Sequence, residues 1–191
     1  QYQVVFNAAS FALAAMIATF VFLLACQGRV LPRYRQALVI SAMVCLIAAY
    51  HYYRIFNSFT EAYIANGSGQ PMTAVPTFVM VNGPGFNEGY RYVDWLLTVP
   101  LLLWETIAVL ALAPAVRRSL LMKLIPASAL MIALGYPGEI SSDNMTRGIW
   151  GALSTIPFLY ILYVLWVELS RAMTTQPEQV RKDLNGLRLL L

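Results

Sequence analysis

The sequence predicts an all-α, polytopic membrane protein, a bundle of helices that cross a lipid bilayer. Of its 191 residues, 59% are hydrophobic and only 12% are charged, whereas a soluble domain carries about 25% charged residues. Five stretches are mostly apolar over the roughly 20 residues that a helix needs to cross a bilayer. They do not alternate apolar and polar residues as barrel strands do. Helices also satisfy their own backbone hydrogen bonds inside lipid.

The five predicted spans follow one another through short connections, except after the second span. Their predicted bounds are 4–26, 37–59, 90–113, 119–135 and 146–173. The connection at residues 66–89 is long and rich in Gly, Pro and Asn, and its apolar segment "TFVMV" lies between turn signals. We therefore predict a short β-hairpin in this connection. No repeat or linker divides the chain, so we expect residues 1–191 to form a single transmembrane domain.

The charges of the connections predict the orientation. Basic residues gather in the first and third connections and after the last span, and acidic residues gather in the second and fourth connections. Because basic connections stay on the cytoplasmic side, we expect the N-terminus to lie outside a plasma membrane. The basic residues are Arg29, Arg33, Arg35, Arg117, Arg118, Arg171, Arg181, Lys182 and Arg188, and the acidic ones are Glu61, Glu88, Glu139 and Asp143.

Composition also argues against several classes of partner. The two cysteines, Cys26 and Cys45, lie inside apolar runs and form neither a disulfide framework nor a metal-binding spacing. One histidine without clustered carboxylates gives no ligand set for a metal-dependent enzyme. No basic face is interleaved with aromatic residues, so nucleic acid is not an expected partner. The expected surroundings are the lipid bilayer.

Residues 91–105, "RYVDWLLTVPLLLWE", place charged groups at both ends of an apolar span. On a helix with about 100° per residue, Arg91, Thr98 and Glu105 all lie within about 60° of Asp94. The two carboxylates are separated by about 16 Å along the axis. Carboxylates inside a membrane are expensive and usually functional. The stripe therefore predicts a route for protons rather than two carboxylates with a purely structural role.

The surroundings of the two acids predict opposite charge states. Glu105 follows Leu103 and Trp104, and the loss of hydration there disfavours its charged form. Asp94 lies one turn from Arg91, whose positive charge favours the carboxylate. We expect Glu105 to rest protonated near the cytoplasmic side and Asp94 to rest ionised near the outside, with Thr98 hydrogen-bonded to Asp94. A donor inside and an acceptor outside predict outward transport.

The single histidine, His51, lies in "AAYHYYRIFNSF" in the outer part of the second span. It is expected at about the depth of Asp94, because both residues are near the outer ends of their helices. An imidazole beside a carboxylate shares protons with it as a coupled pair. Lone histidines are often structural, but here the pattern favours involvement with Asp94.

These stretches resemble a known family. "RYVDWLLTVPLLLWE" is similar to the third helix of microbial rhodopsins, in the proton-pumping branch that includes proteorhodopsin and xanthorhodopsin. "YHYYR" resembles the second-helix histidine motif of that branch, and "GALSTIPFLYILYVLW" resembles its fifth helix. The resemblance covers all 191 residues. It implies the seven-helix rhodopsin fold, of which this sequence would hold five helices and the start of a sixth.

The resemblance also implies a role for each matching residue. Asp94 would be the proton acceptor and counterion of a protonated retinal Schiff base, and Glu105 would reprotonate that base. Arg91 would help to control proton release, Thr98 would bond Asp94, and His51 would modulate it. Retinal is thus the implied cofactor. Its pocket would contain Trp95, Leu102, Met131, Gly135, Ser154 and Phe158, although ordinary helix packing explains apolar residues nearly as well.

Gly151 stands where many members of the family have a tryptophan over the retinal ring. Xanthorhodopsin-like members have glycine there, which opens a window to lipid where a carotenoid can lie as a second chromophore. A glycine that lets two helices pack closely is the alternative explanation. The resemblance also suggests a homo-oligomer.

The sequence departs from the family in one respect. Retinal is attached to a lysine of the seventh helix, but the two lysines here are Lys123 and Lys182, and neither is expected in mid-membrane. Since the chain stops within the apolar "LRLLL", we expect it to be C-terminally incomplete. For the complete molecule, a light-driven outward proton pump is the leading interpretation. A sensory photoreceptor and a chromophore-free truncated membrane fragment are the alternatives.

Overall fold

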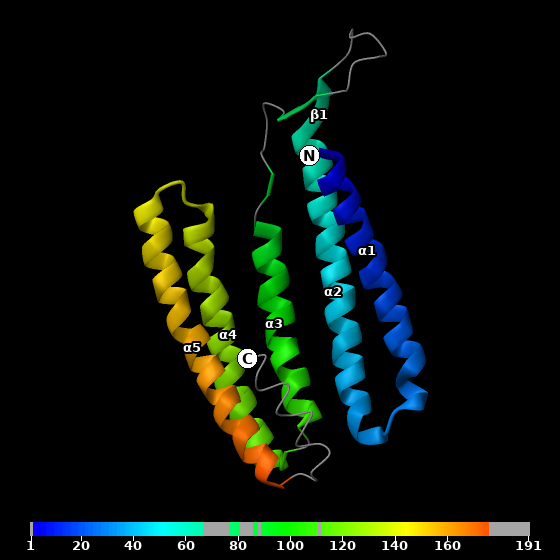
Figure 1. The fold of residues 1–191 in the computed structure, drawn as a ribbon, viewed down its shortest axis with the longest axis vertical. Coiled ribbons are helices and arrows are strands. Elements are labelled where there is room, and N and C mark those ends of the chain that lie inside the picture. The colour runs from blue at the N-terminus through cyan, green and yellow to red at the C-terminus, as the bar shows by residue number, and fades with distance from the viewer. Residues whose placement is uncertain (1, 67–76, 81–85, 88, 111, 176–191) are drawn as a thin grey trace.

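The computed structural model describes residues 2–66, 77–80, 86–87, 89–110 and 112–175. Within these residues the chain forms long helices and one short pair of strands (Figure 1). The order is α1 (Tyr2–Ala25), the 3-10 helix η1 (Cys26–Arg29), α2 (Pro32–Ala62), β1 (Tyr63–Asn66), β2 (Thr77–Met80), α3 (Gly89–Val109), α4 (Pro114–Ile140) and α5 (Asn144–Thr175).

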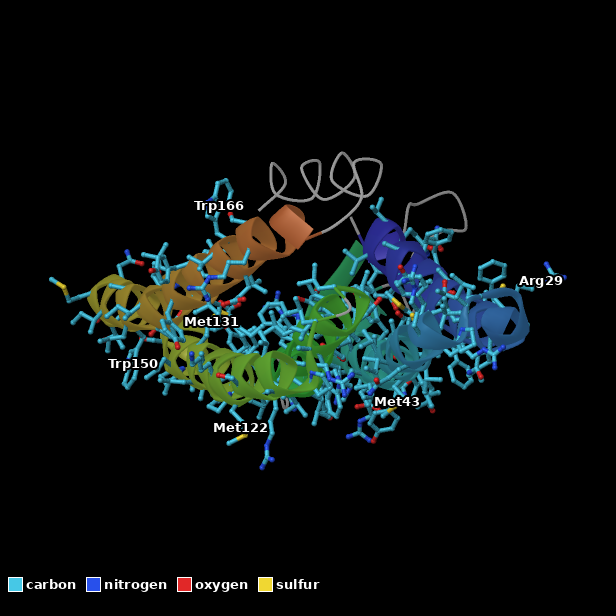
Figure 2. The ribbon with its side chains drawn as sticks, turned by 90° about the horizontal axis from the view of Figure 1, so that it is seen from below. Arg29, Met43, Met122, Met131, Trp150 and Trp166 are labelled. Atoms are coloured by element: carbon cyan, nitrogen blue, oxygen red, sulfur yellow. The ribbon has the colours of Figure 1, made fainter. Side chains whose placement is uncertain are left out.

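All five α-helices are long and apolar enough to cross a membrane. Each packs against the next along the chain, so that α3 lies between the pair α1–α2 and the pair α4–α5. Seen along the bundle in Figure 2, the helices form an open crescent with α1 and α5 at its two ends. Met43 and Met122 project from the convex side of this crescent. We confirm the prediction of a polytopic α-helical bundle.

The most buried part of the bundle joins α3, α4 and α5. Ile107 of α3 and Leu124 of α4 are completely inaccessible to solvent. They belong to a cluster that also contains Leu103, Leu110, Leu120, Ile161 and Leu165. By contrast, α1 buries no residue, and large apolar side chains such as Phe11 are mostly exposed. Exposed apolar surface of this extent is expected where a helix faces lipid instead of water.

The helix ends follow from local sequence signals that extend or shorten the predicted spans. Pro32 and Pro114 begin α2 and α4, where a missing N–H is tolerated. Ala113 is held extended (ψ 141°) because a residue before proline avoids the helical region. The prediction that the third span continues to residue 113 was therefore wrong, since α3 ends at Val109.

Prolines also lie inside three of the helices. Pro100 is in α3, Pro126 and Pro137 are in α4, and Pro157 is in α5. Each proline removes one backbone hydrogen bond, which normally bends a helix. Beyond Pro137, Gly138 allows α5 to approach α4 closely, because a Cβ added at Gly138 would lie 3.1 Å from the Cβ of Trp150.

The predicted β-hairpin is present. Strand β2, which holds the first four residues of "TFVMV", pairs antiparallel with β1, and Tyr63 is opposite Met80. The strand β1 continues directly from the end of α2. Two four-residue strands are short, as is usual for an isolated hairpin at the end of a bundle.

Candidate functional site

Asp94 and His51 come together between α2 and α3. The distance from His51 Nδ1 to Asp94 Oδ1 is 3.4 Å, and the two side chains are only 7% and 11% exposed. Oδ1 of Asp94 is buried and has no hydrogen bond to the described residues. The expectation that the histidine lies at the depth of the aspartate is met. Asp94 thus has His51 close by, and its Oδ1 accepts no hydrogen bond from the residues that the structure describes.

The second contact of His51 indicates which ring nitrogen carries a proton. Nδ1 lies 2.9 Å from the backbone carbonyl oxygen of Ile47, one turn earlier in α2. A carbonyl oxygen can only accept, so Nδ1 must be the donor in this contact. The same N–H is within 3.4 Å of Asp94, toward which it presents positive charge density.

Thr98 is buried one turn after Asp94, and its hydroxyl hydrogen bond does go to that residue. The acceptor is the backbone carbonyl of Asp94, at 2.8 Å from Thr98 Oγ1, and not the carboxylate. Threonine in a helix commonly bonds the carbonyl four residues earlier, because that acceptor is always within reach. This hydroxyl therefore donates no hydrogen bond to the carboxylate of Asp94. The spacing of the two residues in the sequence could not show which oxygen of Asp94 is the acceptor.

Arg91 interacts with a different helix from the one that the polar stripe suggested. Its Nη2 donates a hydrogen bond of 2.7 Å to Oε1 of Glu139 in the last turn of α4. The two side chains are 40% and 32% exposed, so this ion pair is only partly shielded from solvent. The carboxylate of Glu139 is thus a partner of Arg91 that the spacing of residues within α3 did not predict.

Glu105 lies on the same face of α3 as Asp94 and also meets α2. The hydroxyl oxygen of Ser41 is 2.5 Å from Glu105 Oε1 and 3.1 Å from the backbone carbonyl oxygen of Ala37. Cys45, one turn along α2 from Ser41, lies on the same side of that helix. Ser41 carries no distinctive sequence signal, because an isolated serine in an apolar span is common, and sequence reasoning missed it.

The predicted retinal pocket draws on three helices. Trp95 and Leu102 of α3 are 41% and 45% exposed, and Phe158 of α5 is 44% exposed. Trp95 packs against Tyr92 with ring centroids 5.1 Å apart. On a helix, Trp95 and Leu102 are separated from Asp94 by about 80° to 100°. They therefore belong to a different face of α3 from the one that packs on α2.

On α4 and α5, some of the predicted pocket residues are neighbours and others are not. A Cβ added at Gly135 would lie 3.4 Å from the ring of Tyr92 and 3.7 Å from Ser154 Oγ, so these three residues meet. Met131 instead packs, partly buried, against the apolar cluster. An added Cβ at Gly151 would meet nothing within 4 Å among the described residues. Gly151 therefore does not serve close packing between the described helices.

A cavity of about 350 Å³ lies between the N-terminal half of α3 and the C-terminal half of α4. It is lined by Gly89, Tyr92, Val93, Leu96, Ile132, Ala133 and Tyr136. None of the predicted pocket residues lines it. Its lining residue Tyr92 packs against Trp95 and lies beside Gly135, so the cavity adjoins these two predicted pocket residues.

The residues present fit one end of a bound retinal but not its attachment. The buried, unused Oδ1 of Asp94 suits a cationic N–H donor, which is what a retinal–lysine linkage would present. Lys123 is exposed on α4, and Lys182 lies outside the described residues. No group of three or more possible metal ligands occurs in the described part of the chain.

The comparison with protein families decides the class of the molecule. Residues 5–191 match the family model described as "Bacteriorhodopsin-like protein". The chain belongs to this family. Its members are the microbial rhodopsins, and the chain is accordingly a multi-pass membrane protein that resides in a lipid bilayer.

Two curated relatives illustrate the range of this rhodopsin family. Archaerhodopsin-2 of Halobacterium sp. (strain aus-2) is 38% identical over 133 residues, which cover 69% of this chain and 49% of the relative. The green-light absorbing proteorhodopsin of Gamma-proteobacterium EBAC31A08 is 32% identical over 155 residues, which cover 80% of this chain and 52% of the relative. The chain thus spans about half the length of these relatives.

Two solved rhodopsin structures match the entire chain. Xanthorhodopsin, described as a light-driven ion pump with dual chromophore, shares 46% identity with a TM-score of 0.86. A thermophilic rhodopsin shares 48% identity with a TM-score of 0.87. The chain covers 74% and 73% of these two structures. The five α-helices therefore match the seven-helix rhodopsin fold, as the resemblance implied.

Proposed function

We propose that the complete molecule is a light-driven outward proton pump. The observation that carries this proposal is the pair of carboxylates on one face of α3, each with its own polar partner on α2. Asp94 is buried beside His51, and Glu105 is partly buried beside Ser41. Intramembrane carboxylates arranged in this way are a common basis for proton relays. The match to light-driven and light-absorbing relatives supports light as the energy source.

Asp94 is proposed as the proton acceptor. Its Oδ1 has no hydrogen bond to the described residues and has room for a donor, and Nδ1 of His51 lies 3.4 Å from it. Retinal, when bound through a lysine, supplies a light-sensitive cation that can release and regain a proton. Thr98 fixes the backbone of α3 at Asp94 through its hydroxyl, so that the carboxylate keeps its place beside α2.

Glu105 is proposed as the internal proton donor. The single hydroxyl proton of Ser41 cannot serve the two acceptors within its reach, Glu105 and the carbonyl of Ala37. If Glu105 is protonated, it donates to Ser41, and Ser41 donates to Ala37, so that every contact is a hydrogen bond. This arrangement supports a neutral Glu105 at rest, ready to give a proton from the cytoplasmic side.

Several finer assignments belong to the same proposal. The residues that would contact retinal are Trp95, Leu102, Met131, Gly135, Ser154 and Phe158. The open space beside Gly151 supports a carotenoid-accessible window.

We also propose a single transmembrane domain, a homo-oligomer, a plasma-membrane location and an N-terminus outside. The alternating basic and acidic connections support that orientation.

The proposal is tested with the full-length protein, reconstituted with retinal in lipid vesicles of known orientation. Illumination should drive protons toward the side of Asp94, and a protonophore should abolish the resulting pH change. Asp94→Asn should remove transport and shift the visible absorption to the red, whereas Asp143→Asn in the outer connection should retain transport. Absence of a light-induced pH change in the unmodified protein would refute proton pumping. A pigment that signals through a slow cycle would then favour the sensory alternative.

A further inference from the structure

The cavity between α3 and α4 opens on the convex side of the bundle. Met122 projects from that side (Figure 2), and the lining residues Ala133 and Tyr136 follow it by 11 and 14 residues on α4. These spacings are close to three and four helical turns, so the three side chains share one face. From α3, Val93 and Leu96 line the cavity with 49% and 43% of their surface exposed. The cavity is therefore open to the lipid around this side.

Three side chains with hydrogen-bond donors lie at one end of this cavity. The hydroxyl of Tyr136 lies beside Gly89, where an added Cβ would be 3.3 Å from it. The next residue, Tyr90, accepts a hydrogen bond of 2.7 Å from Nη2 of Arg54, whose guanidinium lies 5.1 Å from the centroid of the Tyr90 ring. Neither tyrosine hydroxyl donates a hydrogen bond to a described residue. Both protons, and further N–H groups of the guanidinium, are therefore available to an acceptor.

Arg54 forms no ion pair with a carboxylate in the described part of the chain. It follows Met43, which also projects from the convex side, by 11 residues on α2 and so lies on the same face. Glu139 is already engaged by Arg91, and Glu61 lies about two turns beyond Arg54. A phosphate group offers both the negative charge and the several acceptor oxygens that these donors need.

We propose that this part of the convex side binds an anionic phospholipid of the surrounding bilayer. Arg54 and the Tyr90 hydroxyl bind its phosphate, the Tyr136 hydroxyl binds an ester carbonyl, and one acyl chain enters the cavity. The volume of about 350 Å³ is near the lower end for ligand pockets, about 300–1,000 Å³, and suits part of a single chain. Lipid tails are as apolar as leucine, so the chain alone gives little preference. Preference for a negative head group comes from Arg54.

The depth of each group agrees with a phospholipid that stands upright in the bilayer. Gly89 is the first residue of α3, and Tyr136 lies about one turn before the end of α4, so the donors are near the level of the head groups. The cavity continues from Gly89 to Leu96, about 10 Å along the helix. Its deeper walls are mainly apolar side chains, which lose dispersion contacts if the space stays empty.

The test uses native mass spectrometry of the full-length, retinal-reconstituted protein in detergent. The protein is titrated with phosphatidylglycerol or phosphatidylcholine that carry the same acyl chains. The first phosphatidylglycerol should bind at least about threefold more tightly, and Arg54→Gln should weaken it by about threefold to tenfold, because the lost contact is charge-assisted but exposed to water. The matched control is Arg33→Gln. Arg33 is also exposed and lies 4.6 Å from the centroid of the Tyr34 ring, but neither residue lines the cavity, so the first binding event should be unchanged.

A second pair of variants tests the acyl-chain part of the site. Ala133→Leu occupies space in the cavity and should weaken the first binding event of both lipids by about threefold or more. Ala18→Leu adds the same side chain at an exposed position of α1 and should change neither. Inorganic phosphate should displace little phosphatidylglycerol, because it has no chain to place in the cavity. Full displacement by inorganic phosphate would show an anion site without a lipid, and would overturn the proposal.

Three other results would also overturn it. These are equal affinity for the two lipids, equal effects of Arg54→Gln and Arg33→Gln, and a loss of oligomers in Arg54→Gln and Ala133→Leu with unchanged lipid binding. The last result would assign this face to a second copy of the chain. If Ala133→Leu yields no pigment, the comparison of Arg54→Gln with Arg33→Gln decides. None of these measurements depends on proton transport, so a protein that binds retinal without pumping would leave the lipid site standing.

Discussion

The contact between Ser41 and Glu105 gives a prediction whose direction depends on whether Glu105 is protonated in the dark. In Ser41→Ala the hydroxyl is lost, while Ser41→Thr keeps it in the same place. If Glu105 is protonated and donates to Ser41, removing the hydroxyl destabilises the neutral acid and makes its proton easier to release. If Glu105 is ionised and accepts from Ser41, the removal destabilises the charged form instead, and release becomes harder.

The size of the effect follows from one hydrogen bond. A neutral intramolecular hydrogen bond contributes about 0.5–1.5 kcal/mol, and such bonds between membrane helices average about 0.6 kcal/mol. With about 1.4 kcal/mol for each factor of ten, Ser41→Ala should accelerate the internal reprotonation step roughly threefold to tenfold. Refilling of Glu105 from the cytoplasm should slow by a similar factor, because the neutral product has lost the same bond.

Two measurements check this prediction in the retinal-reconstituted, full-length protein. Flash-induced absorption changes give the rates of reprotonation and of final recovery. Infrared difference spectra show whether Glu105 has a protonated carboxyl band in the dark, and that band should move to higher frequency when its hydrogen bond is lost. Slower reprotonation in Ser41→Ala, together with no carboxyl band in the dark, would refute the reasoning. Ser41→Thr should behave like the unmodified protein.

Three further predictions concern the donor, the core and the outer connection. Glu105→Gln should leave the first light-induced deprotonation intact and slow recovery by more than tenfold in flash experiments, and unchanged recovery would remove Glu105 as donor. Leu124→Ala, at a fully buried site, should lower the unfolding free energy in bicelles by about 1–3 kcal/mol. This is the packing part of a loss that reaches about 5 kcal/mol in water-soluble cores. Met122, on the convex side, is 71% exposed, so Met122→Ala should change the unfolding free energy little. Hydrogen bonds from the hydroxyl and amide of Thr146 lower the pKa of Asp143. In thermal melts, the extra stability of the unmodified protein over Asp143→Ala should therefore be largest near neutral pH and should disappear as the pH falls through that lowered pKa. A stability difference that increases in acid would contradict this reasoning.

Much of the fold could be predicted because lipid restricts the choices. Apolar runs of sufficient length must be helices, and all five were found at nearly the predicted places. The errors occur where neighbouring residues, not hydropathy, set the boundary. Ala111–Ala113 read as apolar span, but Pro114 begins the next helix and prevents α3 from continuing. The hairpin could be predicted from its turn signals, whereas its first strand could not, because Tyr63–Asn66 continues from a helical sequence.

The site was only partly visible in the sequence. Helical spacing placed Asp94 and Glu105 on one face, and both do meet α2. Spacing within one helix cannot show which partners other helices supply. Glu139 read as an outer charge that orients the chain, yet it binds Arg91 across 48 residues of sequence. Ser41 is similarly distant from Glu105 in sequence, and the backbone acceptor of Thr98 depends on a side-chain rotamer.

Pro100 has a mechanical consequence for the proton route. It lies between Asp94 and Glu105, and its missing N–H leaves the carbonyl of Leu96 without its usual partner. The segments of α3 before and after Pro100 are therefore joined by one backbone hydrogen bond fewer than in an uninterrupted helix. A bend at this point would tilt Asp94 relative to α2 without moving Glu105. In the proposed proton pump, such a bend would let the surroundings of the two carboxylates change separately.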